Sequence, residues 1–102
     1  MSSIEALKQN KLIKANLAKK LKTTEKRIQA VAEEIVAFAI TKNYEFTARE
    51  LTLWAQATPT SNLSQIIDWS LNLEYQIAIT EEMLSYVTEI FIGNKIYKLS
   101  LL

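Results

Sequence analysis

Apolar residues recur at spacings of three and four along residues 25–42, and the same spacing returns over 48–57. Such spacing places apolar side chains on one face of an amphipathic helix. The first stripe comprises Ile28, Val31, Ile35 and Phe38. The second stripe comprises Leu51, Trp54 and Ala55. The pattern therefore predicts two helices separated by a short aromatic turn.

The turn between these helices carries its own start and stop signals. Thr47 can accept from the free N–H groups of the second helix, and Glu50 can reach back to the Thr47 N–H, which predicts a capping box. Phe46 and Leu51 occupy the two positions of a hydrophobic staple. Asn43 tolerates the left-handed conformation that ends many helices. We therefore expect the two helices to form a hairpin over about 25–57.

The N-terminal region predicts a basic helix over about 4–22. Its apolar seam is narrow, with Ile13, Leu17 and Leu21 four residues apart among lysines. Such a helix is marginal alone and needs a surface on which to dock. We expect residues 1–22 to dock loosely, either on the rest of the chain or on a partner protein.

A further helix is predicted over 62–73, after Pro59 has ended the preceding one. Ser61 or Asn62 can cap its N-terminus. Residues 74–79 then alternate between polar and apolar, which is compatible with a frayed helix end or a short strand.

The C-terminal segment, 81–101, predicts either a helix or a β-hairpin. Thr80-Glu81-Glu82 is expected to open a new element, apolar residues follow at helical spacing over 81–91, and we favour a helix there. The competing prediction pairs 86–92 with 95–101 around Gly93-Asn94, a segment rich in β-branched residues. Taken together, the pattern predicts a mainly α fold, a small helical domain.

The composition supports one domain and limits its chemistry. The chain has 102 residues, about half of them apolar, and contains no Cys and no His, which removes thiolate and imidazole chemistry. Its single Gly excludes a glycine-rich phosphate loop. The carboxylate pairs Glu33-Glu34 and Glu81-Glu82 point apart on a helix, because adjacent residues diverge by about 100°. We expect no enzymatic activity, no cofactor and no metal site.

Charge is distributed unevenly along the chain. Residues 1–27 hold eight basic and two acidic residues, a net charge of +6, and the remainder holds four basic and nine acidic residues, a net charge of −5. This pattern is typical of two solvated faces that attract each other, or of a basic arm for an acidic partner or nucleic acid. No aromatic residue interleaves the lysines, which makes nucleic acid an unlikely partner. Without a signal sequence or a membrane-spanning apolar run, the expected location is cytoplasmic.

A winged helix-turn-helix is an alternative interpretation of the region 48–101. It would use 48–57 and 62–73 as its two helices and the C-terminal hairpin as its wing. The reading helix, 62–73, carries Asp68 and no Lys or Arg, whereas phosphate contacts require basic residues.

Residues 33–54, EEIVAFAITKNYEFTARELTLW, resemble the leader-peptide family associated with nitrogen-fixation gene clusters, the Nif-eleven type. The matching positions are Ile35, Phe38, Ala39, Tyr44, Phe46, Thr47, Glu50 and Leu51. Residues 17–34 are also in keeping with that family, and 79–93 resemble its closing segment. The chain departs from the family where Asn43 replaces the usual Gly and a single Gly93 replaces a double-glycine cleavage site.

The resemblance implies a recognition domain that a maturation enzyme binds before acting on the C-terminal tail of the same chain. The partner-binding candidates are Ile35, Phe38, Tyr44, Phe46, Leu51 and Trp54. The tail would begin near residue 89, with Asn94, Tyr97 and Ser100 as candidates for modification. Without the double glycine and Cys, an adaptor protein that keeps the leader fold is an equal interpretation. The apolar C-terminal segment can also form a homodimer by strand pairing.

Overall fold

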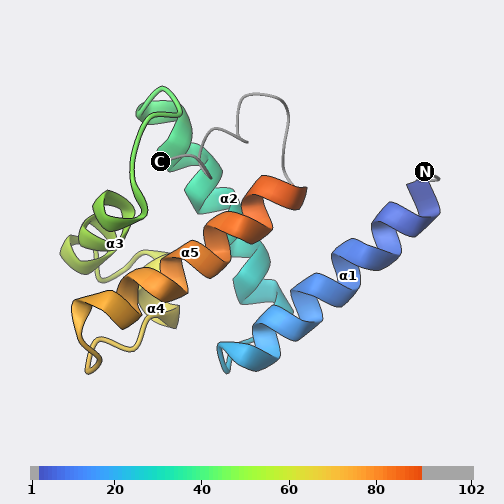
Figure 1. Cartoon of the computed structure of the whole chain (residues 1–102), viewed down its shortest axis with the longest axis horizontal. Helices are drawn as coiled ribbons and strands as arrows, with labels where there is room; N and C mark the ends of the chain where they lie inside the picture. The colour runs from blue at the N-terminus through green and yellow to red at the C-terminus, as the bar shows by residue number, and fades with distance from the viewer. Residues whose placement is uncertain (1–2, 91–102) are drawn as a thin grey trace.

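Five helices account for the regular structure of the described part of the chain, in which the computed structural model places the backbone of residues 3–90 and the side chains of 12–88. In order they are α1 (Ser3–Lys20), α2 (Glu25–Thr41), α3 (Ala48–Ala57), α4 (Asn62–Ile66) and α5 (Leu73–Ile90). Helix α5 crosses α2 and also packs against α1 and α3, while α4 contacts α2 and α3 (Figure 1). This arrangement confirms the mainly α prediction.

The core draws its largest fully buried side chains from four of the helices. Ile28 and Ile35 come from α2, Leu51 from α3, Leu63 from α4 and Met83 from α5. The apolar stripe predicted for residues 25–42 therefore points into this core, and the helices close around it as the burial of apolar surface requires.

The helix ends follow the local signals in the sequence. Thr24 and Ser61 accept from backbone N–H groups three residues on, and Thr47 accepts from the N–H of Glu50 at 3.1 Å. The Glu50 carboxylate accepts from the Thr47 hydroxyl at 3.4 Å instead of from the predicted backbone N–H. After α2 the chain turns through Asn43 at φ 56°, as expected, and Tyr44 shares that left-handed conformation at φ 62°.

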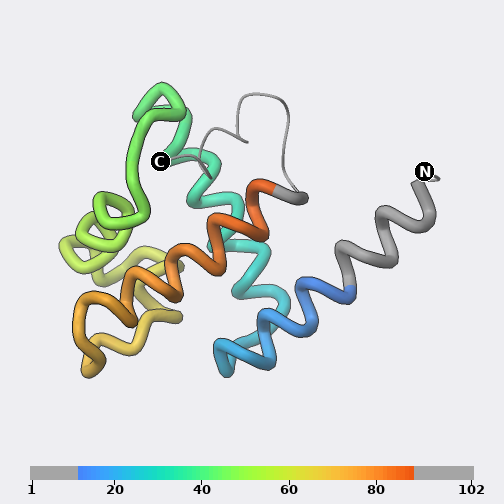
Figure 2. Tube along the Cα trace, in the orientation of Figure 1, coloured from blue at the N-terminus to red at the C-terminus, as the bar shows by residue number. Residues whose placement is uncertain are grey.

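Helix α1 docks on its own domain through its C-terminal half. Leu17 and Ala18 are buried against the body, with Ile13 and Leu21 packed beside them. The part of α1 that follows residue 11 runs beside the start of α2 (Figure 2). The helix ends two residues earlier than predicted, at Lys20, and Lys22 follows in the left-handed conformation.

The helix predicted over 62–73 begins at Asn62 with Ser61 as its cap, as expected, but its predicted end is wrong, because α4 ends at Ile66. Ile67 is extended, and the Asp68 carboxylate accepts from both the N–H and the hydroxyl of Ser70. The Trp69 indole N–H donates to the Ser64 carbonyl at 3.0 Å. These side-chain bonds give the connection a local alternative to helical hydrogen bonding.

Residues 74–79 form the first turns of α5 and are neither a frayed end nor a strand. Thr80, predicted to open a new element, lies inside α5, where its hydroxyl donates toward the Gln76 carbonyl at 3.3 Å. That hydroxyl is also 2.7 Å from the Thr52 hydroxyl of α3, and both side chains are fully buried. Tertiary packing therefore extends one helix through a sequence that reads locally as a boundary.

The C-terminal helix expected from residue 81 is confirmed as far as Ile90, as the second half of α5. The competing hairpin is wrong over 86–90, because these residues form the last turns of α5. Tyr86 and Val87 are adjacent and both buried, whereas adjacent residues of a strand point to opposite faces. The predictions for 95–101 and for Asn94, Tyr97 and Ser100 fall outside the described residues.

The winged helix-turn-helix alternative loses its reading helix, since α4 has five residues. None of the described helices combines the length and the apolar character needed to cross a membrane.

Candidate functional site

The structure separates the six predicted partner-binding residues into two groups. Four of them are buried in the core: Ile35, Phe38, Phe46 and Leu51. Tyr44 and Trp54 are half-buried and pack against the core from its edge. A partner that binds the folded domain can therefore touch Tyr44 and Trp54 directly, whereas the other four shape the surface from beneath.

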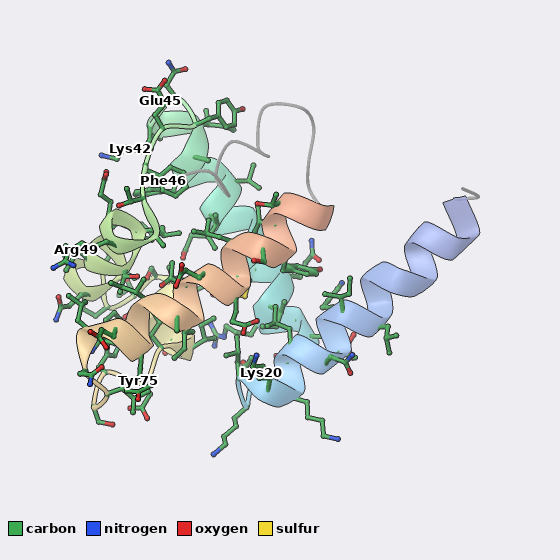
Figure 3. The ribbon with its side chains drawn as sticks, in the orientation of Figure 1. Lys20, Lys42, Glu45, Phe46, Arg49 and Tyr75 are labelled. Atoms are coloured by element: carbon green, nitrogen blue, oxygen red, sulfur yellow. The ribbon has the colours of Figure 1, made fainter. Side chains whose placement is uncertain are left out.

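Three aromatic rings hold α2 against α3. The ring of Phe38 meets that of Phe46 edge to face, with 4.9 Å between centroids and 88° between planes. The Trp54 ring lies 5.3 Å from Phe38 at 51°. Lys42 places its Nζ 5.7 Å from the centre of the Phe38 ring, and Figure 3 labels this lysine beside Phe46. Edge-to-face packing and the cation over the ring both add to the burial of these side chains.

A groove of about 430 Å³ opens next to this aromatic cluster, and we call it the aromatic groove. Phe38 and Trp54 contribute its rings, and Glu34, Ala37 and Thr41 line it from α2. The connection between α3 and α4 completes the lining with Thr58, Thr60 and Ser61. The groove is thus walled by aromatic rings, methyl groups and hydroxyls, with one charged residue.

That charged residue, Glu34, is engaged in holding α4. Its two carboxylate oxygens accept from the backbone N–H groups of Asn62 at 2.8 Å and Leu63 at 3.0 Å. Arg27 donates to the Asn62 side-chain oxygen at 2.8 Å. These bonds satisfy N–H groups at the start of α4 that no intrahelical carbonyl can reach. The sequence offers no sign of this role, because Glu33 and Glu34 look alike there.

An apolar shoulder borders the aromatic groove on α2. Ala37 is exposed and lines the groove, and Ile40 follows it one turn later with 58% of its surface exposed. Residues three apart on a helix are surface neighbours. A docking segment can therefore contact Ile40 while it reaches toward Trp54.

A second groove runs between the end of α1 and α5, and we call it the α1 groove. It consists of two hollows that share Lys20 and Glu82. The outer hollow, about 380 Å³, has an apolar lining formed by Leu21, Ile66, Leu71, Tyr75, Ala78 and Ile79. The inner hollow, about 280 Å³, is lined from α5 by Ser85 and Tyr86 and from α1 by Ile13, Asn16 and Leu17.

Opposite charges face each other across the α1 groove. Lys20 Nζ forms an ion pair with Glu82, and both residues line the two hollows. Figure 3 labels Lys20 on α1 and Tyr75 on α5. Bonds from the Ser70 hydroxyl and N–H hold the pKa of the exposed Asp68 below its usual value, and Lys22 lowers it further. Among the side chains of 12–88, Lys20–Glu82 is the one ion pair between the basic N-terminal part and the acidic remainder.

At the inner hollow, burial raises the pKa of the Tyr86 hydroxyl, and the negative charge of Glu25 raises it further. Sequence reasoning missed both grooves, because each is made by elements distant in the chain. Within the described residues, no group of three or more His, Cys, Asp or Glu side chains is placed to hold a metal ion.

Comparisons with protein-family models, with curated proteins and with solved structures find no match to this chain. The resemblance of residues 33–54 to leader peptides stays a prediction.

Proposed function

We propose that this chain is a cytoplasmic, non-catalytic recognition domain of the leader type, bound by a maturation enzyme through the aromatic groove. The observation that carries the proposal is an open groove of about 430 Å³ with the half-buried Trp54 as a wall. Part of the groove lining, from Glu34 to Trp54, belongs to the helical hairpin whose sequence resembles leader peptides.

The chemistry of the groove suits an apolar side chain from a partner protein. Trp residues that keep part of their surface exposed beside a hollow are frequent anchors of protein interfaces. Removing an apolar side chain from water into such a hollow is worth about 1.5–3 kcal/mol. The single carboxylate, Glu34, already accepts two hydrogen bonds. A docked side chain can therefore exclude water from the groove while the carboxylate keeps its hydrogen-bond partners.

The groove is also rigidly supported, which lowers the entropy cost of binding. Its floor rests on the edge-to-face contact between Phe38 and Phe46. Its rim is tied to α2 by the bonds that Glu34 accepts from the start of α4. The partner therefore meets a shaped surface and does not have to order it.

The leader interpretation assigns the tail after residue 89 as the region on which the enzyme acts. The positions that carry functional groups are Asn94, Tyr97 and Ser100. If the chain instead acts as an adaptor, the aromatic groove still binds the partner while the tail keeps its mass.

The test is recovery of the tagged full chain from its native host, with identification of bound proteins and measurement of its intact mass. Thr60→Arg places a long cation at the rim of the aromatic groove at an exposed position. Gln56→Arg makes an equal change of charge at an exposed position of α3 outside the groove. Both positions are on the surface, so both variants should keep the fold.

We expect a modifying enzyme to be recovered with the wild type and with Gln56→Arg but lost with Thr60→Arg. We also expect the wild-type tail to be shortened or shifted in mass. A full-length, unmodified chain whose partner is lost with Thr60→Arg supports the adaptor. Recovery of the same proteins with all three chains refutes the aromatic groove as the binding site, and specific recovery of nucleic acid refutes the recognition domain.

A further inference from the structure

We propose that the α1 groove binds residues 95–102 of the same chain. The inference is independent of the proposed function, because it concerns a different groove and requires no enzyme. It follows from the position of the groove relative to the end of α5, from the length of chain that follows, and from the apolar pattern of that segment.

Helix α5 forms one side of both hollows and presents them in order. Tyr86 and Ser85 line the inner hollow, Glu82 lies between the hollows, and Tyr75 lies in the outer one. The helix ends at Ile90, about one turn beyond Tyr86. A chain that reverses direction after α5 therefore meets the inner hollow first and the outer hollow next.

The segment after α5 has a suitable turn and sufficient length. Gly93-Asn94 is a pair that readily adopts turn conformations. The segment from 95 to 102 can extend over about 26 Å. The part of α5 from Tyr75 to Tyr86 is only about 16 Å long. Residues 95–102 can therefore cover both hollows without strain.

The side chains of this segment match the groove. Tyr97, Leu99 and Leu101 alternate with Lys98 and Ser100, so an extended chain presents one apolar edge. The outer hollow offers an apolar lining to that edge. Its border carries two lysines and two carboxylates, which leave no net charge to oppose the segment.

Two exposed residues of the outer hollow indicate where the contact is made. Tyr75 has 60% and Leu71 has 39% of its surface exposed, on the α5 side of the hollow. A docked apolar edge would cover both. Ala78 lies between these two residues and the inner hollow. A helix rises about 1.5 Å per residue and an extended chain about 3.3 Å, so residues 99–100 of the docked segment would lie nearest to Ala78.

The absence of cysteine from the chain allows a direct test by disulfide formation in the full-length protein. One variant carries Ala78→Cys with Leu99→Cys, which tests the α1 groove, since residue 99 lies on the apolar edge that would face it. The matched control carries Ala37→Cys with Leu99→Cys, since Ala37 is an exposed alanine of the aromatic groove. A disulfide requires the two Cβ atoms to approach within about 4.5 Å.

A tail that is tethered but not docked would oxidise with either cysteine at rates set by the tether alone. We expect the Ala78→Cys pair to form an intramolecular disulfide about tenfold faster than the control. Equal rates, a faster control, or cross-linked dimers as the main product would each overturn the proposal.

A second measurement repeats the oxidation of the Ala78→Cys pair after an exposed residue that lines the outer hollow has been replaced. Tyr75→Ser should slow disulfide formation several-fold, whereas Leu53→Ser, at a 43% exposed position of α3, should leave the rate unchanged. Circular dichroism establishes that both retain their helices. Tyr97→Ser in the tail should reproduce the slowing without touching the groove, and an unchanged rate in Tyr75→Ser and Tyr97→Ser would overturn the proposal.

Discussion

Glu34→Ala should destabilise the domain far more than Glu33→Ala, although the two glutamates are adjacent. Glu34 accepts two backbone bonds from α4, at 2.8 and 3.0 Å, and Glu33 is exposed on the surface. A hydrogen bond to a charged group is worth about 1.5–3 kcal/mol. Because Glu34 is half-buried and water can reach part of the start of α4, we expect a total loss of about 2 kcal/mol.

Glu34→Gln should fall between the two, with a loss of about 1 kcal/mol, since its amide oxygen can accept one bond while its NH₂ group faces a second donor. Urea unfolding followed by tryptophan fluorescence and far-ultraviolet circular dichroism measures all three variants. For a domain of this length the Ala variant should melt about 10 °C lower. A Glu34→Ala stability within about 0.5 kcal/mol of Glu33→Ala would refute the role assigned to the carboxylate.

Three further predictions concern the buried polar groups of α5. Thr52→Val and Thr80→Val should show a coupling of about 1 kcal/mol in a double-mutant cycle, because their hydroxyls lie 2.7 Å apart; additive losses would contradict it. The raised pKa of Tyr86 means that its stabilising effect is complete below the unfolded pKa of about 10 and lost as the pH rises through the folded pKa. Tyr86→Phe should therefore lose less stability than the wild type as the pH rises above about 9 in urea titrations, and parallel curves would disprove this. Gln76→Leu should cost about 1–2 kcal/mol and expose the connection between α4 and α5 to proteases, since the Gln76 amide donates to two of its carbonyls at 2.8 and 3.4 Å; unchanged cleavage would count against that role.

Local patterns were sufficient for the helical hairpin. The periodic stripe of α2, the cap at Thr47 and the left-handed Asn43 are interactions within a few residues, so their consequences appear in the sequence directly. The burial of Phe38 and Leu51 also follows, because an apolar stripe on a helix needs a core to pack against.

The sequence was misleading where local and distant interactions compete. The boundary between α4 and α5 has signals of its own, an Asp68–Ser70 turn and an Asn72 side chain that accepts from the Tyr75 N–H. Both signals can be recognised in the sequence, but the helical spacing of the apolar residues around them favours a helix that continues to residue 73. Thr80 looks like a start signal until the position of Thr52 on another helix is known.

What the sequence determined by itself is the presence of helices, their apolar faces, most of their caps and the unequal distribution of charge. Only the tertiary structure decided which carboxylate holds α4, which aromatic residues remain at the surface, and which helices enclose the two grooves. Each of these depends on contacts between residues far apart in the chain, such as Glu34 with Leu63 and Lys20 with Glu82. Periodicity identifies the face of a helix that is buried, but the neighbour that buries it is chosen by packing of the whole domain.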